Sequence, residues 1–121
     1  MTNLIDDRQK KSPEERIFRL EQQTVVVENF DCQGYILDLG GGGTGIIGLL
    51  KGQQVISLLP PKKEKEATVP GYLKVLMEAH DLKFLNNSFN LVTAFFAFMY
   101  IDQRHHEVVF REIYRVLKPG G

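Results

Sequence analysis

A short apolar run that ends in a cluster of glycines is the feature that most constrains how this chain can fold. Residues 35–39 (YILDL) have the composition of a strand, and residues 45–51 (GIIGLLK) that of a short helix. Between them, Gly40, Gly42 and Gly45 match the spacing G-x-G-x-x-G. Such a turn lets the backbone approach a ligand closely and leaves the amides at the start of the helix available to it. The sequence therefore predicts a ligand-binding turn between a strand and a helix.

Three more apolar runs predict further strands, at residues 55–59, 73–77 and 91–99. Strands that alternate with helices are typical of an α/β domain with a parallel sheet. We therefore expect a Rossmann-like three-layer sandwich with a mostly parallel sheet. Its strand order would be 3-2-1-4, counting from the strand at residues 35–39, with the later strands of such domains missing. Asp102 is expected to cap a last helix, whose apolar face holds Val109, Phe110, Ile113, Val116 and Leu117.

The N-terminal part of the chain is expected to be organised differently. Residues 1–11 are polar and mixed in charge, which is typical of a mobile arm. Ser12, Pro13 and Glu15 form a capping-box pattern, so a helix is expected to begin there and the segment 12–34 to be helical. Residues 25–27 (VVV) fit either a continuation of this helix or a short extended piece. The Rossmann-like domain would then comprise residues 35–121.

Charge and cysteine content argue against several classes of protein. Fifteen Lys and Arg residues balance fifteen Asp and Glu residues, which argues against nucleic acid or an anionic membrane surface as a partner. No apolar run reaches the roughly 18 residues that span a bilayer, and the N-terminus has no apolar signal core. The single cysteine, Cys32, fits a reducing compartment. We therefore expect a cytoplasmic protein that does not contact a membrane.

Three segments in the same order carry a resemblance to a known family. The segment ILDLGGGGTG resembles motif I of the class I S-adenosylmethionine-dependent methyltransferases, with one residue, Thr44, inserted before the last glycine. The segment MEAHDLKFLNNSFNLV is similar to the region after the third strand of that family, and FREIYRVLKPGG to its helix and turn after the fourth strand. The resemblance covers residues 35–121. It implies methyl transfer from S-adenosyl-L-methionine to an unknown acceptor, or the cofactor-binding half of such an enzyme.

The resemblance also implies which residues meet the cofactor. The methionine part would be held by the first strand and the glycine turn, and the adenine by Glu78, through its carboxylate, and Ala79, through its amide. Asp81 would brace the turn that follows, and residues 96–100 would border the methyl acceptor. The residues implied at the methionine part are Asp38, Gly40, Gly41, Gly42 and Gly45.

Leu59 departs from the family pattern at the ribose. A carboxylate at the end of the second strand normally holds the ribose hydroxyls, and the alignment of QVISLLP puts Leu59 in that place. Leucine cannot accept a hydrogen bond. The loss of such a contact is worth about 1.5–3 kcal/mol, or roughly ten- to a hundred-fold in affinity. Leu59 is expected to line the cofactor pocket without binding the ribose.

No catalytic residue can be named from the sequence, because the reaction depends mainly on proximity and orientation. His80, His105 and His106 lack the spacing of a zinc site, so no metal is expected, and His105 and His106 are expected at the surface. Two other functions remain open: a methyltransferase-like binding or assembly module without catalysis, and a domain that binds NAD or FAD. The apolar fourth strand would leave a bare edge, through which the chain would form a homo-oligomer.

Overall fold

The computed structural model describes residues 4–6, 15–20, 23–40, 46–62, 73–95 and 97–121. The chain divides into two compact units, Met1–Cys32 and Gln33–Gly121. The boundary between the units lies two residues before the start expected for the Rossmann-like domain.

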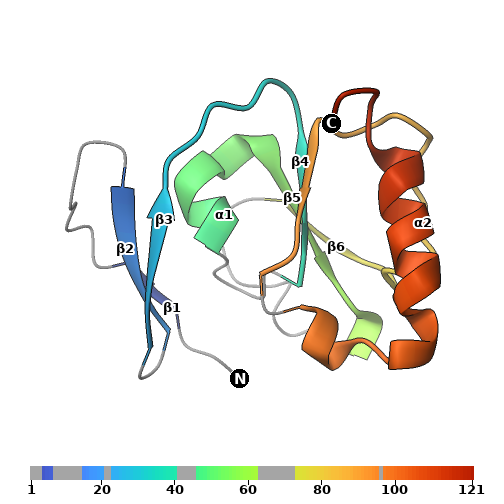
Figure 1. Ribbon diagram of the computed structural model, residues 1–121, viewed down its shortest axis with the longest axis horizontal. Coiled ribbons are helices and arrows are strands. Elements are labelled where there is room, and N and C mark those ends of the chain that lie inside the picture. The colour runs from blue at the N-terminus through green and yellow to red at the C-terminus, as the bar shows by residue number, and fades with distance from the viewer. Residues whose placement is uncertain (1–3, 7–14, 21–22, 41–45, 63–72, 96) are drawn as a thin grey trace. The chain divides into compact units, whose positions relative to one another are not determined.

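The second unit contains a four-stranded parallel sheet (Figure 1). Its strands are β4 (Ile36–Leu39), β5 (Val55–Leu59), β6 (Leu73–Leu76) and β7 (Leu91–Thr93), in the order β6-β5-β4-β7. The strand order 3-2-1-4 is therefore confirmed. Ile36 pairs with Val55 on one side and with Leu91 on the other. Because the strands run parallel, their carboxyl ends meet at one edge of the sheet.

Two helices cover opposite faces of this sheet, which confirms the three-layer architecture (Figure 1). The short helix α1 (Ile46–Lys51) buries Ile46 and Ile47. The longer α2 (His106–Val116) packs Val109 and Val116 into a core that includes residues of all four strands. Single turns of 3-10 helix also connect these elements, among them η1 (Gly52–Gln54), η3 (Phe98–Tyr100) and η4 (Gln103–His105).

The apolar face expected for the last helix is confirmed at four of its five positions. Val109 and Val116 are buried, and Ile113 and Leu117 are partly buried. Phe110 is 59% exposed, and its ring stacks on that of Phe98, with 4.9 Å between the centroids. The helix itself begins later than expected, because Asp102 caps η4 rather than α2 by accepting a hydrogen bond from the amide of Arg104.

The first unit is an antiparallel sheet of three strands, so the prediction of a helical segment at 12–34 is wrong. Its strands are β1 (Leu4–Asp6), β2 (Glu15–Leu20) and β3 (Gln23–Glu28), in the order β1-β2-β3. The capping-box pattern is a local signal, whereas Val26 pairs across strands with Ile17, and β-branched residues favour strands. Residues 4–6 pair with β2, so they do not form a mobile arm. Residues 1–3 and 7–14 lie outside the described part.

The fourth strand of the main sheet is shorter than expected. It was expected over residues 91–99, but it ends at Thr93, and the chain turns into η3 at Phe98. The apolar run continues past the strand because Ala97 is buried in the core and Phe98 packs against it. The strand expected at 73–77 ends at Leu76, and the next amide, that of Met77, still bonds to the carbonyl of Leu59 at 3.0 Å.

Candidate functional site

The carboxyl ends of the parallel strands bring the predicted cofactor residues to one edge of the sheet. Asp38 and Gly40 lie at the end of β4, Leu59 at the end of β5, and Glu78 and Ala79 just beyond β6. The amide of Gly40 bonds to the carbonyl of Leu58 at 2.9 Å, which ties the start of the glycine turn to β5. Gly41, Gly42 and Gly45 lie outside the described residues.

Asp38 is a buried carboxylate in the centre of the sheet. Its side chain is 2% exposed, and it accepts a hydrogen bond of 2.7 Å from the hydroxyl of Thr93. Burial raises the pKa of Asp38 from 3.8 to about 6, although the hydrogen bond from Thr93 acts in the opposite direction. Asp38 pairs in register with Ser57 as well as with Thr93, so three polar side chains cross the sheet side by side. This carboxyl group therefore changes charge close to neutral pH.

Gly40 meets two requirements that only glycine satisfies. Its φ of 71° lies in the left-handed region, which glycine adopts without steric cost. A Cβ at this position would lie 3.0 Å from the Cβ of Ala97, which is closer than ordinary van der Waals contact. The glycine turn thus starts with a sharp change of chain direction directly against the segment that follows β7.

Leu59 occupies the end of β5 as a core residue. Its side chain is 1% exposed, and it has no atom that could bind a hydroxyl group. Its backbone carbonyl is already engaged by the amide of Met77. The structure therefore places an apolar side chain in the position where the resemblance implies a ribose-binding carboxylate.

The segment after β6 forms a tight turn with one buried and one exposed residue. Ala79 is buried in the core, whereas Glu78 is exposed. The amide of Asp81 bonds to the carbonyl of Glu78 at 3.0 Å, which closes the turn. Asp81 also forms an ion pair of 2.9 Å with Lys83. Both side chains of this pair are exposed, so the ion pair adds little stability.

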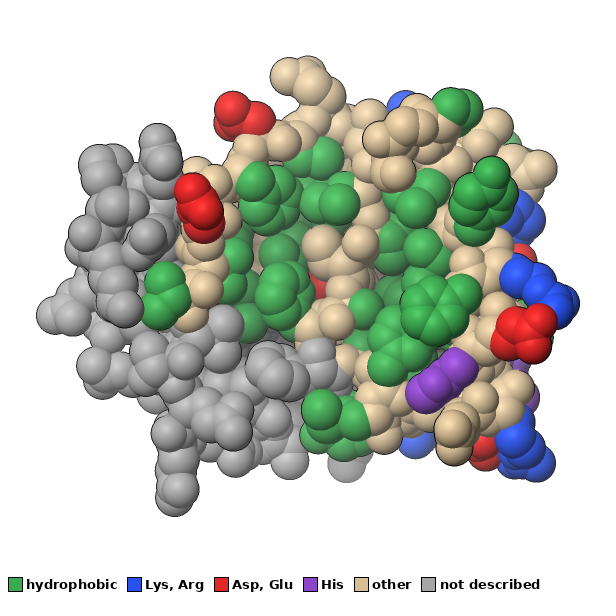
Figure 2. Space-filling view, in the orientation of Figure 1, with side chains coloured by type: hydrophobic (Ala, Val, Ile, Leu, Met, Phe, Trp, Pro, Cys, Tyr) green, Lys and Arg blue, Asp and Glu red, His purple; other side chains and the backbone are tan. Residues whose placement is uncertain are grey.

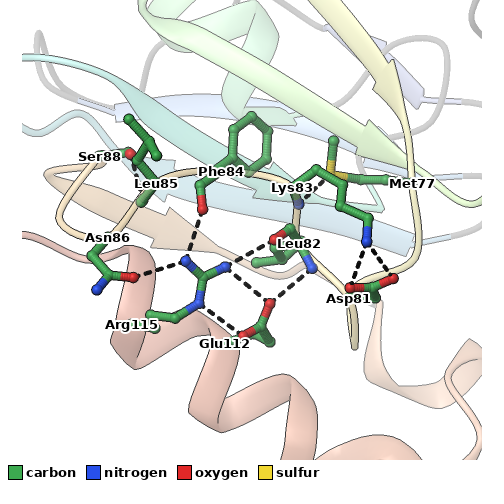
Figure 3. A network of polar contacts seen from close by, with 10 residues as sticks. All are labelled: Met77, Asp81, Leu82, Lys83, Phe84, Leu85, Asn86, Ser88, Glu112 and Arg115. Carbon is green, nitrogen blue, oxygen red and sulfur yellow. Dashed lines mark hydrogen bonds and ion pairs between the residues drawn. The ribbon is translucent and has the colours of Figure 1, made fainter.

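A charged pair on α2 holds the rest of this loop in place (Figure 3). Arg115 donates to the carbonyls of Leu82 and Phe84, at 2.8 and 2.7 Å, and to the side chain of Asn86. Glu112 accepts from the amide of Leu82 at 2.8 Å and from Arg115. The hydrogen bond from Arg115 lowers the pKa of Glu112, so this carboxylate stays ionised. We call Glu112 and Arg115 the loop clamp.

The sequence interpretation missed the loop clamp. The spacing of Glu112 and Arg115, three residues apart, indicates only that the two can pair on one face of a helix. The backbone groups that they hold lie about 30 residues earlier. No pattern in the sequence connects them to that loop.

Two of the three histidines stack on one another near the same edge. The rings of His80, in the turn after β6, and His105, in η4, have centroids 4.1 Å apart and are inclined by 11°. Both side chains are partly buried, so His105 is less exposed than the solvated surface position expected for it. His106 is also partly buried, and its Nε2 lies 2.9 Å from the carbonyl oxygen of Ile101. Among the described residues, no three potential metal ligands gather in one place.

Comparison with known families decides what kind of domain this is. Residues 37–121 match the family described as "Methyltransferase domain". The chain belongs to this methyltransferase-domain family. No curated protein matches the chain as a relative.

Solved structures resemble this methyltransferase domain in fold. The PH0226 protein from Pyrococcus horikoshii matches with a TM-score of 0.62 and 26% identity, over 74% of this chain and 47% of its own. The YcgJ protein from Bacillus subtilis gives 0.54 and 25%, over 73% and 42%. An S-adenosylmethionine-dependent methyltransferase from Mesorhizobium loti gives 0.57 and 23%, over 76% and 46%. The chain thus spans less than half the length of each of these structures.

Large hydrophobic side chains lie on the surface of the methyltransferase domain. Figure 2 shows hydrophobic groups at the surface across one face of the molecule. Met99 and Tyr100 in η3 are exposed, and so are Phe110 and Tyr114 on α2. No helix in the described ranges is both long and apolar enough to cross a bilayer.

Proposed function

We propose that this chain binds S-adenosyl-L-methionine as part of a methyltransferase that acts on an acceptor still to be identified. Family membership and the fold support this proposal. The observation that carries it is the end of β4, where the buried Asp38 is followed two residues later by Gly40 with a left-handed backbone. A cofactor that needs close backbone approach fits this turn.

Different residues at the sheet edge would hold different parts of the cofactor. Asp38, Gly40 and the glycines at 41, 42 and 45 would surround the methionine part, and Glu78 and Ala79 would meet the adenine. When bound, S-adenosyl-L-methionine supplies a methyl group on a positively charged sulfur. The chain contributes position and orientation toward the acceptor, and no side chain of the described residues is proposed as a catalytic acid or base.

The residues present fit this cofactor in part. The exposed carboxylate of Glu78 and the left-handed Gly40 suit an adenosine compound at this edge. Leu59 offers nothing to the ribose hydroxyls, so we expect weaker binding than a carboxylate at that position would give.

A glycine variant with a matched control tests the cofactor site. Gly40→Ala places a methyl group against Ala97 at a left-handed position, whereas Gly52→Ala meets nothing within 4 Å although its φ is also positive, at 56°. We expect Gly40→Ala to lose S-adenosylhomocysteine binding in calorimetry and Gly52→Ala to retain it. Thermal melting shows whether both variants are folded. Equal binding by two folded variants would contradict the proposed site.

A second candidate function is a methyltransferase-like binding or assembly module without catalysis. The buried Leu59 favours it, because an apolar residue in the ribose position suits a domain that has lost its cofactor. If the folded chain binds neither S-adenosylmethionine nor S-adenosylhomocysteine, this candidate replaces the first. A domain that binds NAD or FAD is a third candidate, and it would show itself by binding one of those compounds instead.

We also propose a homo-oligomer through the edge of β7 and a cytoplasmic location. Within the described residues, β7 pairs with β4 alone, and a parallel bridge to Leu117 involves Phe89, which precedes the strand. An unpaired strand edge favours association with another chain. The single cysteine of the chain supports a reducing compartment. The methyl acceptor is not identified.

A further inference from the structure

We propose that His80 and His105 are a positioning pair, whose stacked rings fix the turn at residues 78–81 against η4. The pair is not a catalytic residue set, because its role is to place Glu78 and Ala79. That part of the inference rests on the proposed function, in which these two residues meet the adenine. The stacking contact itself does not depend on any ligand.

The geometry of the stack joins two separate segments. His80 lies inside the turn that the bond from the Asp81 amide to the Glu78 carbonyl closes at 3.0 Å. Its ring lies 4.1 Å from that of His105 and nearly parallel to it. A planar ring in such a stack has little freedom to rotate. Because His80 directly follows Ala79, the stacking contact restricts the turn that contains both residues.

Both sides of the stack rest on ordered structure. In η4, the amide of His105 bonds to the carbonyl of Asp102 at 2.8 Å, and the Asp102 carboxylate accepts from the amide of Arg104 at 2.9 Å. On the other side, Ala79 is buried in the core and Leu82 is held by the loop clamp. The stack thus fixes the middle of a segment whose two flanks are already held.

Substitutions of His105 test whether the stacked ring holds the turn. His105→Ala removes the ring, whereas His105→Phe keeps a flat ring that can stack on His80. His80→Phe is the reciprocal variant, and His106→Gln is the control for loss of a neighbouring histidine that is outside the stack. The first measurement is hydrogen exchange of residues 78–82 in the free protein. The second is the affinity for S-adenosylhomocysteine under the same conditions.

We expect His105→Ala to raise the exchange rate of residues 78–82 at least several-fold and to weaken S-adenosylhomocysteine binding several-fold. His105→Phe and His80→Phe should keep both close to the wild-type values, because each retains a flat ring in the stack. His106→Gln should behave like the wild type in both measurements.

Three outcomes have different consequences. Unchanged exchange of residues 78–82 in His105→Ala would overturn the positioning role. Exchange in His105→Phe as fast as in His105→Ala would overturn the role of the flat ring. If the wild type binds no S-adenosylhomocysteine, the proposed function fails, while the exchange experiment still decides whether the pair fixes the turn.

Discussion

The hydroxyl group of Thr93 on β7 donates a hydrogen bond to the buried carboxylate of Asp38 on β4, with 2.7 Å between the two oxygens. Burial nevertheless dominates, and it raises the pKa of Asp38 from 3.8 to about 6. The folded protein therefore holds this proton more tightly than the unfolded chain does. The contribution of Asp38 to the free energy of unfolding falls as pH rises from about 4 to about 6 and is constant above that.

Replacing Asp38 with asparagine is predicted to stabilise the fold and to weaken the site. The shift from 3.8 to about 6 corresponds to about 3 kcal/mol of lost stability when the carboxylate is charged. Asp38→Asn removes that charge and keeps an oxygen that can accept from Thr93. Urea unfolding should therefore show a variant up to about 3 kcal/mol more stable than the wild type at pH 8, with S-adenosylhomocysteine binding reduced.

The same experiment at low pH is the control for Asp38. Below pH 4 both side chains are neutral, so the stability advantage of Asp38→Asn should disappear. An equal difference in free energy of unfolding at low and high pH would contradict the assignment of a buried, titrating carboxylate. Thr93→Val removes the hydrogen bond that favours the charged form, and it should destabilise the protein more at pH 8 than at pH 4.

The loop clamp is predicted to be sensitive even to a conservative change. Arg115→Ala leaves the carbonyls of Leu82 and Phe84 without this donor and should cost about 2–3 kcal/mol in the free energy of unfolding. Arg115→Lys should cost nearly as much, because an ammonium group cannot reproduce the planar set of donors. Arg111→Ala is the matched control, since its ion pair with Glu107 is exposed. Equal urea midpoints for the wild type and Arg115→Ala would contradict the clamp.

A carboxylate introduced at the end of β5 tests the ribose position. Leu59→Asp should lower the melting temperature because Leu59 is buried, yet it should raise the affinity for S-adenosylhomocysteine by roughly ten-fold if the carboxylate reaches the ribose. Leu59→Ala creates space without an acceptor and is the control. If calorimetry gives the two folded variants the same affinity, Leu59 does not occupy the ribose position.

Self-association is predicted from the edge of β7. Sedimentation velocity should show a dimer or larger species at tens of micromolar, and a charge placed on the edge, as in Val92→Lys, should reduce it. Val92 is partly buried, so circular dichroism must show that the variant is folded. A monomer alone at these concentrations in the wild type would contradict the prediction.

The main sheet could be predicted because its signals are local. Residues 55–59 form an apolar run of the kind that a strand buried on both faces requires, and β5 occupies this range. The N-terminal strands could not be predicted from the sequence. A capping pattern for a helix can be read directly from the sequence, whereas the pairing of Ile17 with Val26 becomes apparent only in the folded chain. The extent of β7 was overestimated because buried residues such as Ala97 extend the apolar run beyond the strand.

The predictions for the site depended on the same difference between local sequence signals and contacts that form only on folding. The predicted residues lie at strand ends or just after them, and the parallel topology alone brings strand ends together. They are Asp38, Gly40, Leu59, Glu78 and Ala79. The stack of His80 on His105 and the contacts of Arg115 join residues far apart in the chain. Such contacts depend on the folded positions of loops, which a single sequence does not specify.

The measurement that tests the account most directly is a calorimetric titration of the wild-type chain with S-adenosylmethionine and S-adenosylhomocysteine, with NAD as the control ligand. The account predicts binding of both sulfur compounds, weakened by Leu59, and no binding of NAD. Binding of NAD alone, or of none of the three by a chain shown to be folded, would contradict it.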